Sequence, residues 1–242
     1  MEQFSDRILY WEKTKNIPIT HAQADRFSSY VEMVFEENMV TNITGFASRE
    51  AILDKLVLES LNTMSTLGVP RGTTLIDVGS GAGIPGIPTA ILFPDSRCVL
   101  LEVNLKKATF LNNVKWQLGL TNVEIIVDRA ESAARAENLR ESFDLAVCRA
   151  VGGIYMVAEF LLPFVRVGGR AFMFTNKLLS ELNSREITHI DELGGQAANL
   201  TATNSEEFVH GIILEKNAPT GEKYPRRFAV IKREAARCEN GI

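Results

Sequence analysis

The stretch LIDVGSGAGIPGIPTAI, residues 75–91, constrains the fold of this chain more than any other, because four glycines follow directly on an apolar run. Glycine adopts positive φ freely and lets a ligand approach the backbone closely. An apolar run, a glycine-rich turn and a helix-like run in succession are typical of the first strand, loop and helix of an α/β protein. The stretch therefore predicts an α/β fold with a ligand site at the carboxyl end of this strand.

Short runs rich in Val, Ile and Leu recur after residue 70, separated by helix-length segments, which indicates parallel strands buried on both faces. We expect strands over 73–78, 97–103, 123–127, 143–148, 168–175, 196–203, 208–216 and 227–233. Two of the last three should pair as an antiparallel hairpin at the sheet edge. The pattern predicts a doubly wound, Rossmann-like sheet of about seven strands.

Residues 1–70 show a different pattern, with apolar side chains spaced by three and four residues and little strand signal. One such stripe lies within 27–35, and Ser48 is a candidate N-cap for a further helix. We therefore expect a helical N-terminal subdomain over 1–70 and a ligand-binding domain over 71–242, packed as one compact unit. A charged amphipathic helix is expected over 177–192.

Composition and charge exclude several classes of protein. With 45% hydrophobic and 23% charged residues over 242 positions, the chain has the composition of a globular domain rather than a disordered one. It has no apolar run near the roughly 20 residues that cross a bilayer and no signal-peptide pattern, so we expect a cytoplasmic protein without membrane contact. The net charge of −4 gives no general attraction to a polyanion, so nucleic-acid contacts must come from local basic patches.

Cysteine, histidine and tryptophan give no sign of a further site. Cys98, Cys148 and Cys238 are odd in number and far apart, so we expect reduced thiols rather than disulfides or zinc ligands. The three histidines are equally scattered, and we expect no bound metal. Trp11 and Trp116 lie on apolar faces of expected helices, which places both in the predicted core.

Two ligand classes fit the glycine loop. A GxGxxG pattern, read as Gly81, Gly83 and Gly86, would predict a dinucleotide, but it starts two residues late and contains Pro85. The pattern Asp-x-Gly-x-Gly-x-Gly, which begins at Asp77, fits better and is typical of the S-adenosylmethionine loop of methyltransferases. In such a loop the acid can accept a hydrogen bond from the methionyl ammonium. We therefore expect S-adenosylmethionine as the cofactor, with a dinucleotide as the weaker alternative.

Residues at two further strand ends extend this expected site. Glu102 ends the second strand, 19 residues after Gly83, where an acid commonly accepts hydrogen bonds from ribose hydroxyls. Asp128, Arg129 and Ala130 close the third strand, where such folds contact the adenine. The structural alternatives are a tight turn beside an incidental acid and a solvated loop.

The expected fourth strand ends in CRAVGG, residues 148–153, and this segment limits which methyl-transfer reactions the chain could catalyse. An exocyclic-amine methyltransferase would carry Asn or Asp, two prolines and an aromatic residue there, and this chain does not. Cys148 could attack a pyrimidine carbon, but no neighbouring base is evident to activate its thiol. Arg149 could bind a phosphate, a ribose or the O6 and N7 acceptors of a purine, or could pair with a carboxylate. A site without base or nucleophile suits guanine N7, which has a lone pair and no proton.

Four stretches together resemble the glucose-inhibited division protein B family, the bacterial methyltransferases of guanine N7 in the 530 loop of 16S ribosomal RNA. The stretches are NMVTNITGF (38–46), DVGSGAGIPGIPTAI (77–91), LLEVNLKKATFLNNVKWQLGLTNVEIIVDRAE (100–131) and FDLAVCRAV (143–151), and YPRRFAVIKR (224–233) also fits. The resemblance implies a monomeric enzyme with a Rossmann-like S-adenosylmethionine-dependent methyltransferase fold that acts on 16S rRNA or the 30S particle. Arg149 is the expected catalytic residue, orienting the purine or the cofactor. The loop, the strand ends and the resemblance together predict these cofactor-binding residues: Asp77, Gly79, Ser80, Gly81, Gly83, Glu102, Arg129, Ala130, Glu131 and Arg149.

The chain departs from the family pattern at three places. Glu37 stands where a Trp is usual, Leu56 where a His is usual, and Thr175-Asn176-Lys177 replaces a Lys-Gly strand end. These changes bear on the RNA target and on full activity rather than on cofactor binding. Two alternatives stay open: a methyltransferase with another acceptor, and a cofactor-binding paralogue with reduced activity. The basic residues expected to contact RNA are Lys106, Lys107, Lys177, Arg226 and Arg227.

Overall fold

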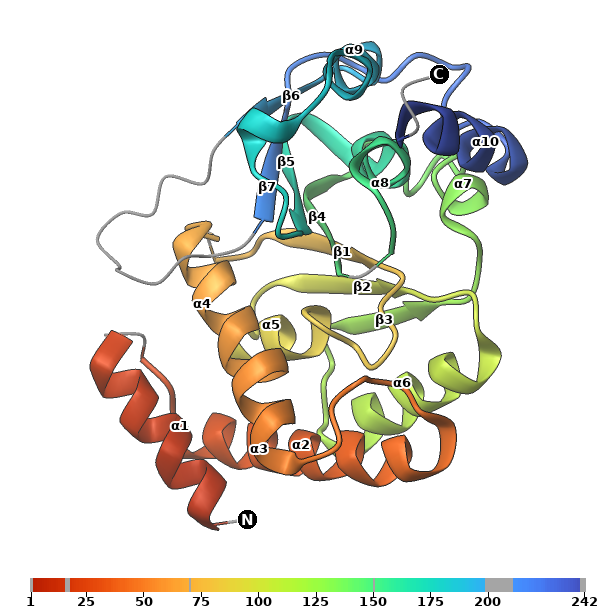
Figure 1. The fold of residues 1–242 in the computed structure, drawn as a ribbon. Helices are drawn as coiled ribbons and strands as arrows, with labels where there is room; N and C mark the ends of the chain where they lie inside the picture. Colours follow the sequence, from red (N-terminus) through yellow and green to blue (C-terminus); the bar gives the residue numbers. More distant parts are fainter. Residues whose placement is uncertain (1, 16–17, 70, 150, 199–210, 240–242) are drawn as a thin grey trace. The chain divides into compact units, whose positions relative to one another are not determined.

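The computed structural model describes residues 2–15, 18–69, 71–149, 151–198 and 211–239 (Figure 1). Its strands are β1 (Thr74–Val78), β2 (Arg97–Leu101), β3 (Val123–Ile126), β4 (Phe143–Arg149), β5 (Val165–Phe174), β6 (Gly195–Ala198) and β7 (Gly211–Lys216). They form a seven-stranded sheet in the order β3-β2-β1-β4-β5-β7-β6. The predicted doubly wound sheet is therefore confirmed.

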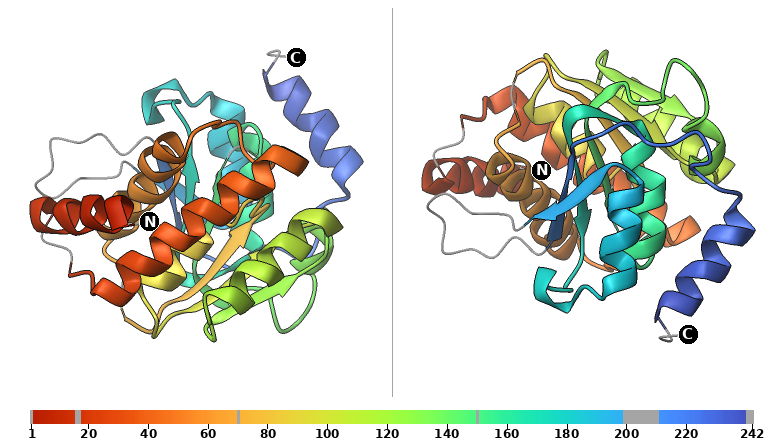
Figure 2. Two further views of the ribbon diagram at one scale, coloured as in Figure 1. Left: turned by 90° about the horizontal axis from the view of Figure 1, so that it is seen from below. Right: turned by 90° about the horizontal axis from the view of Figure 1, so that it is seen from above.

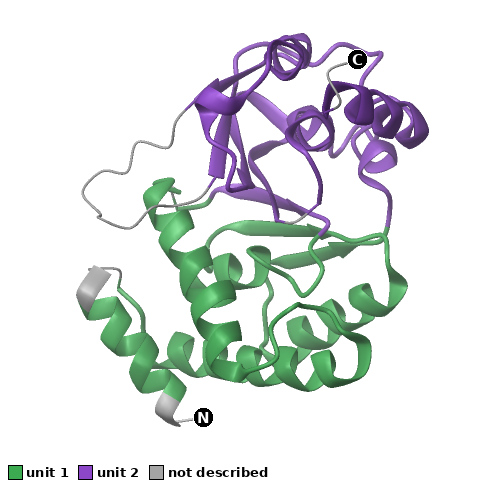
Figure 3. Cartoon of the chain, in the orientation of Figure 1, with its two compact units in different colours: residues 1–72, 80–127 green, residues 73–79, 128–242 purple. Residues whose placement is uncertain are grey.

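Contacts within the chain divide it into two compact units (Figure 3). Unit 1 comprises residues 1–72 and 80–127, and unit 2 comprises residues 73–79 and 128–242. The N-terminal helices therefore share a unit with β2 and β3. The division into a helical subdomain over 1–70 and a ligand-binding domain over 71–242 stays a prediction.

The strand pairs agree with the predicted strand positions. In unit 1, β2 and β3 are parallel, with Leu100 opposite Ile125. In unit 2, β4 runs parallel to β1 and β5, and β7 pairs antiparallel with β5 and β6. The β6–β7 hairpin is thus the antiparallel edge that the sequence predicts. The expected continuations of its strands, 199–203 and 208–210, lie outside the described residues.

Unit 1 holds the helices of the N-terminal part and two later ones. They are α1 (Glu2–Lys15), α2 (His21–Thr41), α3 (Arg49–Ile52), the π-helix η1 (Leu53–Leu58), α4 (Glu59–Thr66), α5 (Gly86–Leu92) and α6 (Leu105–Gln117). Helical structure is confirmed for this part, and Ser48 is the N-cap of α3. Thr20 and Gln23 form a capping box at the start of α2, and Gln23 Nε2 also donates to the carbonyl oxygens of Ile91 and Leu92. These bonds fasten α2 to the end of α5 (Figure 2).

One expected element is wrong: residues 227–233 are not a strand but begin helix α10 (Phe228–Glu239). The buried side chains of α10 are Ile231, Ala235 and Cys238, spaced by four and three residues as on one helical face. RFAVIKR taken alone resembles a strand, and the helical period becomes visible only with the residues that follow it. α10 packs on α8 (Ile154–Leu161) in unit 2 (Figure 2).

The remaining helical segments of unit 2 are short. They are α7 (Ala130–Ala133), the 3₁₀ turns η2 (Leu162–Phe164) and η3 (Leu179–Glu181), and α9 (Ser184–Glu192). The amphipathic helix expected over 177–192 is therefore confirmed only in its second part, because Asn183 caps a new helix start. No helix within the described ranges is long and apolar enough to cross a membrane.

A buried lysine joins several elements of unit 2. Lys216, at the end of β7, is 1% exposed, and its Nζ donates to the carbonyl oxygens of Leu162 and Leu193 and to Thr220 Oγ1. Glu141 Oε1 lies 3.1 Å from the same nitrogen. Burial of the ammonium lowers the pKa of Lys216, an effect that Glu141 opposes. The side chain is thus a polar connection within an apolar interior.

Candidate functional site

The glycine loop after β1 requires glycine at each of its three pattern positions. Gly79, Gly81 and Gly83 all have positive φ, of 73°, 57° and 94°. The N–H groups of Gly83 and Ile84 donate to the carbonyl oxygen of Ser80 at 2.7 and 3.2 Å, which closes the turn. Side chains at the glycine positions would strain this backbone. The loop is therefore a tight, backbone-lined turn, as the sequence predicts.

Gly83 is also required by packing within unit 1. A Cβ at this position would lie 2.6 Å from Ile87 Cγ1 and 2.9 Å from Leu111 Cδ2. Ile87 belongs to α5 and Leu111 to α6, so the loop passes directly against both helices. Tyr30 adds a contact that the sequence pattern did not reveal, because its hydroxyl donates to the carbonyl oxygen of Ala82 at 2.7 Å. The loop is therefore held from outside by packing at Gly83 and by the Tyr30 hydrogen bond.

Glu102 follows β2 directly and contacts the same loop. The side chain is almost buried, at 6% exposure. Its Oε2 accepts a hydrogen bond from Gly81 N, and its Oε1 accepts one from Asn104 N, both at 2.8 Å. A carboxylate has about four acceptor positions, so these two bonds leave capacity on both oxygens. Glu102 can therefore position the loop and accept hydrogen bonds from a ligand at the same time.

In unit 2, Asp77 and Gly79 form the start of the loop. Asp77 lies inside β1 opposite Val147 of β4 and is fully buried. Gly79 lies close to Val151, because a Cβ on the glycine would be 3.0 Å from Val151 Cγ2. A buried carboxylate is stable only beside donors or cations, so Asp77 gives this strand end a preference for a donor or cationic group.

The residues expected beside the adenine contact one another in unit 2. Arg129 Nε donates to Glu131 Oε1 at 2.6 Å, and the Arg129 guanidinium carbon lies 4.6 Å from the ring centre of Phe228. Asp128 accepts hydrogen bonds from Arg129 N and Ser132 Oγ. The Arg129 side chain therefore helps to connect α7 and α10, and a cofactor role for Arg129, Ala130 and Glu131 stays a prediction.

Two neighbouring residues end β4. Arg149 lies opposite Phe174 of β5, with its guanidinium carbon 5.0 Å from the Phe174 ring centre. Cys148 is 2% exposed, and burial, followed by the negative charge of Asp77, raises the pKa of its thiol well above the usual range. A thiol that stays protonated is a poor nucleophile. The end of β4 therefore presents a cation and no activated nucleophile.

Two of the expected RNA contacts, Lys177 and Arg226, form ion pairs within unit 2. Lys177 Nζ lies 2.8 and 2.7 Å from the two carboxylate oxygens of Glu186. Arg226 donates to Glu159 through Nε, NH2 and its backbone N–H, with a shortest distance of 2.5 Å. Both cations are paired with buried acids, which gives each side chain a structural contact. Contact with RNA stays a prediction for all five residues: Lys106, Lys107, Lys177, Arg226 and Arg227.

Glu159 is the centre of the Arg226 contact. Burial raises the pKa of its carboxyl, but hydrogen bonds from His189 and Arg226 outweigh this and lower the pKa to about 2. His189 stacks on Tyr155, with ring centres 3.9 Å apart, and its Nε2 lies 3.1 Å from Glu159 Oε2. The cluster connects the segment before α10, through Arg226, to Glu159 of α8 and His189 of α9.

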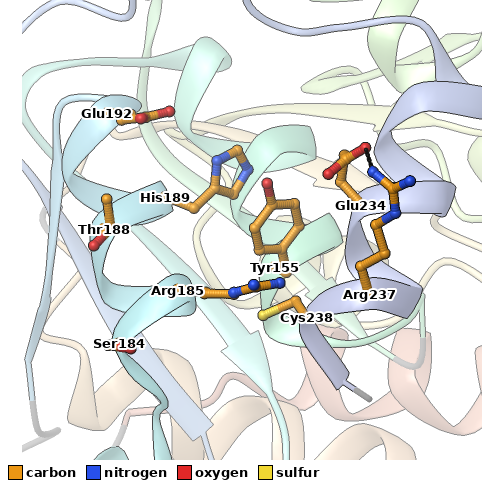
Figure 4. Close-up of a pocket in the computed structure, with 9 residues that line it drawn as sticks. All are labelled: Tyr155, Ser184, Arg185, Thr188, His189, Glu192, Glu234, Arg237 and Cys238. Carbon is orange, nitrogen blue, oxygen red and sulfur yellow. Dashed lines mark hydrogen bonds and ion pairs between the residues drawn. The ribbon is translucent and has the colours of Figure 1, made fainter. Parts of the chain in front are cut away.

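A cavity of about 600 Å³ lies beside this cluster in unit 2 (Figure 4). Its lining residues are Tyr155, Ser184, Arg185, Thr188, His189, Glu192, Glu234, Arg237 and Cys238. Two arginines balance two glutamates, and Arg237 NH1 is paired with Glu234 Oε1 at 3.1 Å. The lining shares no residue with the glycine loop or the ends of β2 and β4. We therefore do not assign the cofactor to this cavity.

Trp116 corrects another prediction. Trp11 is buried in the core, at 8% exposure, as expected, but Trp116 of α6 is 81% exposed. The buried side chains of α6 are Ala108, Phe110, Leu111 and Val114, and Trp116 lies on the opposite face. The helical spacing of these four apolar residues was a signal in the sequence that could have placed Trp116 outside.

The sheet order, the glycine loop after β1 and the acid after β2 together define a Rossmann-like methyltransferase fold. The family model described as rRNA small subunit methyltransferase G matches residues 23–208. This chain therefore belongs to the rRNA small subunit methyltransferase G family, as the sequence resemblance implies.

Named relatives agree with this assignment, and one solved structure shares the fold. The chain is 39% identical over 229 residues to Ribosomal RNA small subunit methyltransferase G of Moorella thermoacetica, covering 92% of this chain and 94% of the relative. The protein of the same name from Trichormus variabilis is 32% identical, with 91% and 93% covered. A structure of an MtNAS mutant in complex with S-adenosylmethionine has a TM-score of 0.53 at 17% identity, covering 82% of this chain and 79% of that chain. This last likeness is one of fold.

Proposed function

We propose that this chain transfers the methyl group of S-adenosylmethionine to N7 of a guanine in the 530 loop of 16S ribosomal RNA. Membership of the rRNA small subunit methyltransferase G family supports the reaction class and the RNA substrate. The observation that carries the choice of atom is the end of β4, where Arg149 follows a buried, protonated thiol at Cys148.

The loop and strand ends would hold the cofactor, which supplies an electrophilic methyl group on sulfur. Glu102 keeps acceptor capacity on both oxygens, which suits the two ribose hydroxyls. Asp77, buried in β1, suits the methionyl ammonium. Gly79, Ser80, Gly81 and Gly83 would line the cofactor with backbone, since positive φ excludes larger side chains at the glycines. A protein of the same fold binds this cofactor in the MtNAS complex.

The choice of guanine N7 as methyl acceptor is supported by the end of β4, where Cys148 is not an activated nucleophile. Guanine N7 carries a lone pair and no proton, so its methylation needs neither a general base nor a covalent intermediate. The lone pair forms the N7–CH₃ bond while the S–CH₃ bond breaks, and the positive charge passes from sulfur to the purine. Arg149 would orient the guanine through its O6 acceptor or the cofactor through a carboxylate, and catalysis would rest on alignment.

The proposal is tested by incubating the protein with methyl-labelled S-adenosylmethionine and, in parallel, 16S rRNA, 30S particles and bulk protein. Label should enter RNA only, and borohydride followed by aniline should cleave the RNA chain at the N7-methylated guanine. Label in RNA without this cleavage would exclude N7. Absence of transfer to RNA at any salt concentration would refute the reaction itself.

One observation favours a second candidate, a cofactor-binding paralogue with reduced activity. The Lys-Gly strand end of the family is replaced by Thr175-Asn176-Lys177, and Lys177 is paired with Glu186 rather than available to a substrate. Cofactor binding with no label transfer in the same experiment would support this candidate.

A further inference from the structure

The exposed face of α6 is one stripe of side chains along the helix. Leu105, Thr109, Asn112 and Trp116 are spaced by four, three and four residues, so they share one helical face. All four are exposed, Leu105 to 70% and Trp116 to 81%. The opposite face of α6 packs within unit 1, where the helix contacts β3 and α2. The stripe is therefore not needed for the core of unit 1.

The chemistry of the stripe is mixed rather than continuously apolar. Thr109 and Asn112 separate the two large apolar side chains, and Asn113 is exposed beside them. A protein-docking face of this length would usually bury a continuous apolar centre. An exposed indole among amide and hydroxyl groups instead suits a nucleic-acid base, which stacks on the ring and leaves its edges for polar contacts.

The charge on α6 points to the same kind of partner. The helix contains Lys106, Lys107 and Lys115 and no acidic residue, although the whole chain has 30 acidic and 26 basic side chains. A local excess of three positive charges on a net-negative protein attracts a polyanion to this helix rather than to the whole molecule. The charge of α6 therefore favours a nucleic-acid partner with a phosphate backbone over a protein partner.

The position of the helix relates this face to the proposed reaction. α6 begins three residues after Glu102, the proposed ribose contact, and Asn104 caps its start by accepting hydrogen bonds from Lys106 N and Lys107 N. From Leu105 to Trp116 the helix rises about 16 Å, which is the span of a few nucleotides. We propose that this exposed face of α6 binds an unpaired segment of the substrate RNA, with one base stacked on Trp116. The inference rests on the proposed RNA methylation.

The test uses the full-length protein, its Trp116→Ala and Trp116→Phe variants, and naked 16S rRNA or 30S particles as substrate. Trp116→Ala should raise the KM for RNA about tenfold, because one stacked base is lost, with kcat and the Kd for S-adenosylmethionine little changed. Trp116→Phe should recover part of the loss, since a smaller ring still stacks. Tyr10 is a matched control, because it is 72% exposed on α1 of the same unit. Tyr10→Ala should leave the KM unchanged.

Fluorescence gives a second readout that does not depend on turnover. The chain has two tryptophans, and Trp11 is buried, so iodide should quench Trp116 selectively. Naked RNA should protect Trp116 from iodide. An unchanged KM for RNA in Trp116→Ala would overturn the inference. Protection of Trp116 by 30S particles but not by naked RNA would also overturn it, and would indicate that this face binds a ribosomal protein. Protection by RNA without any methyl transfer would instead refute the proposed function and leave the RNA surface standing.

Discussion

Glu102 Oε2 accepts a hydrogen bond from the backbone N–H of Gly81 over 2.8 Å, so the acid after β2 holds the glycine loop in unit 1. The other carboxylate oxygen accepts from Asn104 N at the start of α6. A residue expected only to contact the ribose is thus also the connection between the loop and the helix that follows β2. Loss of this side chain should affect the loop as well as the ligand.

Glu102→Ala should weaken S-adenosylmethionine binding by about 1–3 kcal/mol, because a charged acceptor is lost and the Gly81 N–H is left without its bond. Titration calorimetry measures the change. The Kd of Glu102→Gln should lie between those of the unsubstituted protein and Glu102→Ala, since the glutamine amide can accept from one of the two N–H groups but not from both. Glu124→Ala is the control, because Glu124 is a half-exposed acid on β3 paired with Arg97. An unchanged Kd in Glu102→Ala would show that the ribose lies elsewhere.

Gly83→Ala should destabilise the protein by about 1–3 kcal/mol. The added Cβ would overlap Ile87 and Leu111, and the φ of 94° disfavours any side chain. Thermal or urea unfolding measures the loss. Gly45→Ala should be close to neutral, because no atom lies within 4 Å of a Cβ built there. Equal stabilities for the two variants would contradict the packing seen at the loop.

Acid should destabilise unit 2 through Glu159. Its folded-state pKa of about 2 lies below the ordinary value of 4.5, so the carboxylate contributes stability that is fully present above about pH 4.5. As the pH falls from 4.5 through 2, this contribution, on the order of 3 kcal/mol, is lost. Unfolding measured from pH 6 to 2 should show this decline. Glu159→Gln should flatten it, and a decline of the same size in that variant would assign it to other acids.

Arg226 and Arg227 form a matched pair of adjacent cations in different surroundings. Arg226→Ala should cost about 3–5 kcal/mol of stability, because it leaves buried Glu159 without its guanidinium. Arg227 is exposed, so Arg227→Ala should leave stability nearly unchanged and weaken RNA binding slightly. Chemical unfolding and RNA titration on both variants separate the roles. A stable Arg226→Ala protein with weak RNA binding would instead show that Arg226 acts mainly as an RNA contact.

Cys148→Ala should retain methyl transfer within about threefold. The thiol is buried and its pKa is raised, so it does not act as a nucleophile in the proposed reaction. The measurement is the rate of label transfer, together with denaturing electrophoresis for a covalent protein–RNA adduct. Loss of transfer in a folded Cys148→Ala protein, or an adduct in the parent, would point to a covalent mechanism.

The first five strands could be predicted because buried parallel strands produce continuous Val, Ile and Leu runs, and the glycine loop because positive φ restricts residue type. α10 was missed because a seven-residue window cannot distinguish its period from a strand, and Ala235 and Cys238 lie beyond that window. The pairing of Arg226 with Glu159 joins residues 67 positions apart, and no local pattern reveals such a partner. The ion-pair partners of charged side chains are therefore the part of the structure that is hardest to predict from the sequence.

Lys216 makes distant parts of unit 2 depend on one another. The two carbonyl groups that accept hydrogen bonds from its ammonium lie 54 and 23 positions earlier in the chain, at the ends of separate elements. An ammonium in an apolar interior is stable only when its acceptors are in place, so the native packing of β7 depends on the docking of α8 and α9. The lysine thus links the stability of elements that are distant in the sequence: a change that displaces α8 or α9 leaves a buried ammonium short of acceptors and weakens the β7 edge of the sheet.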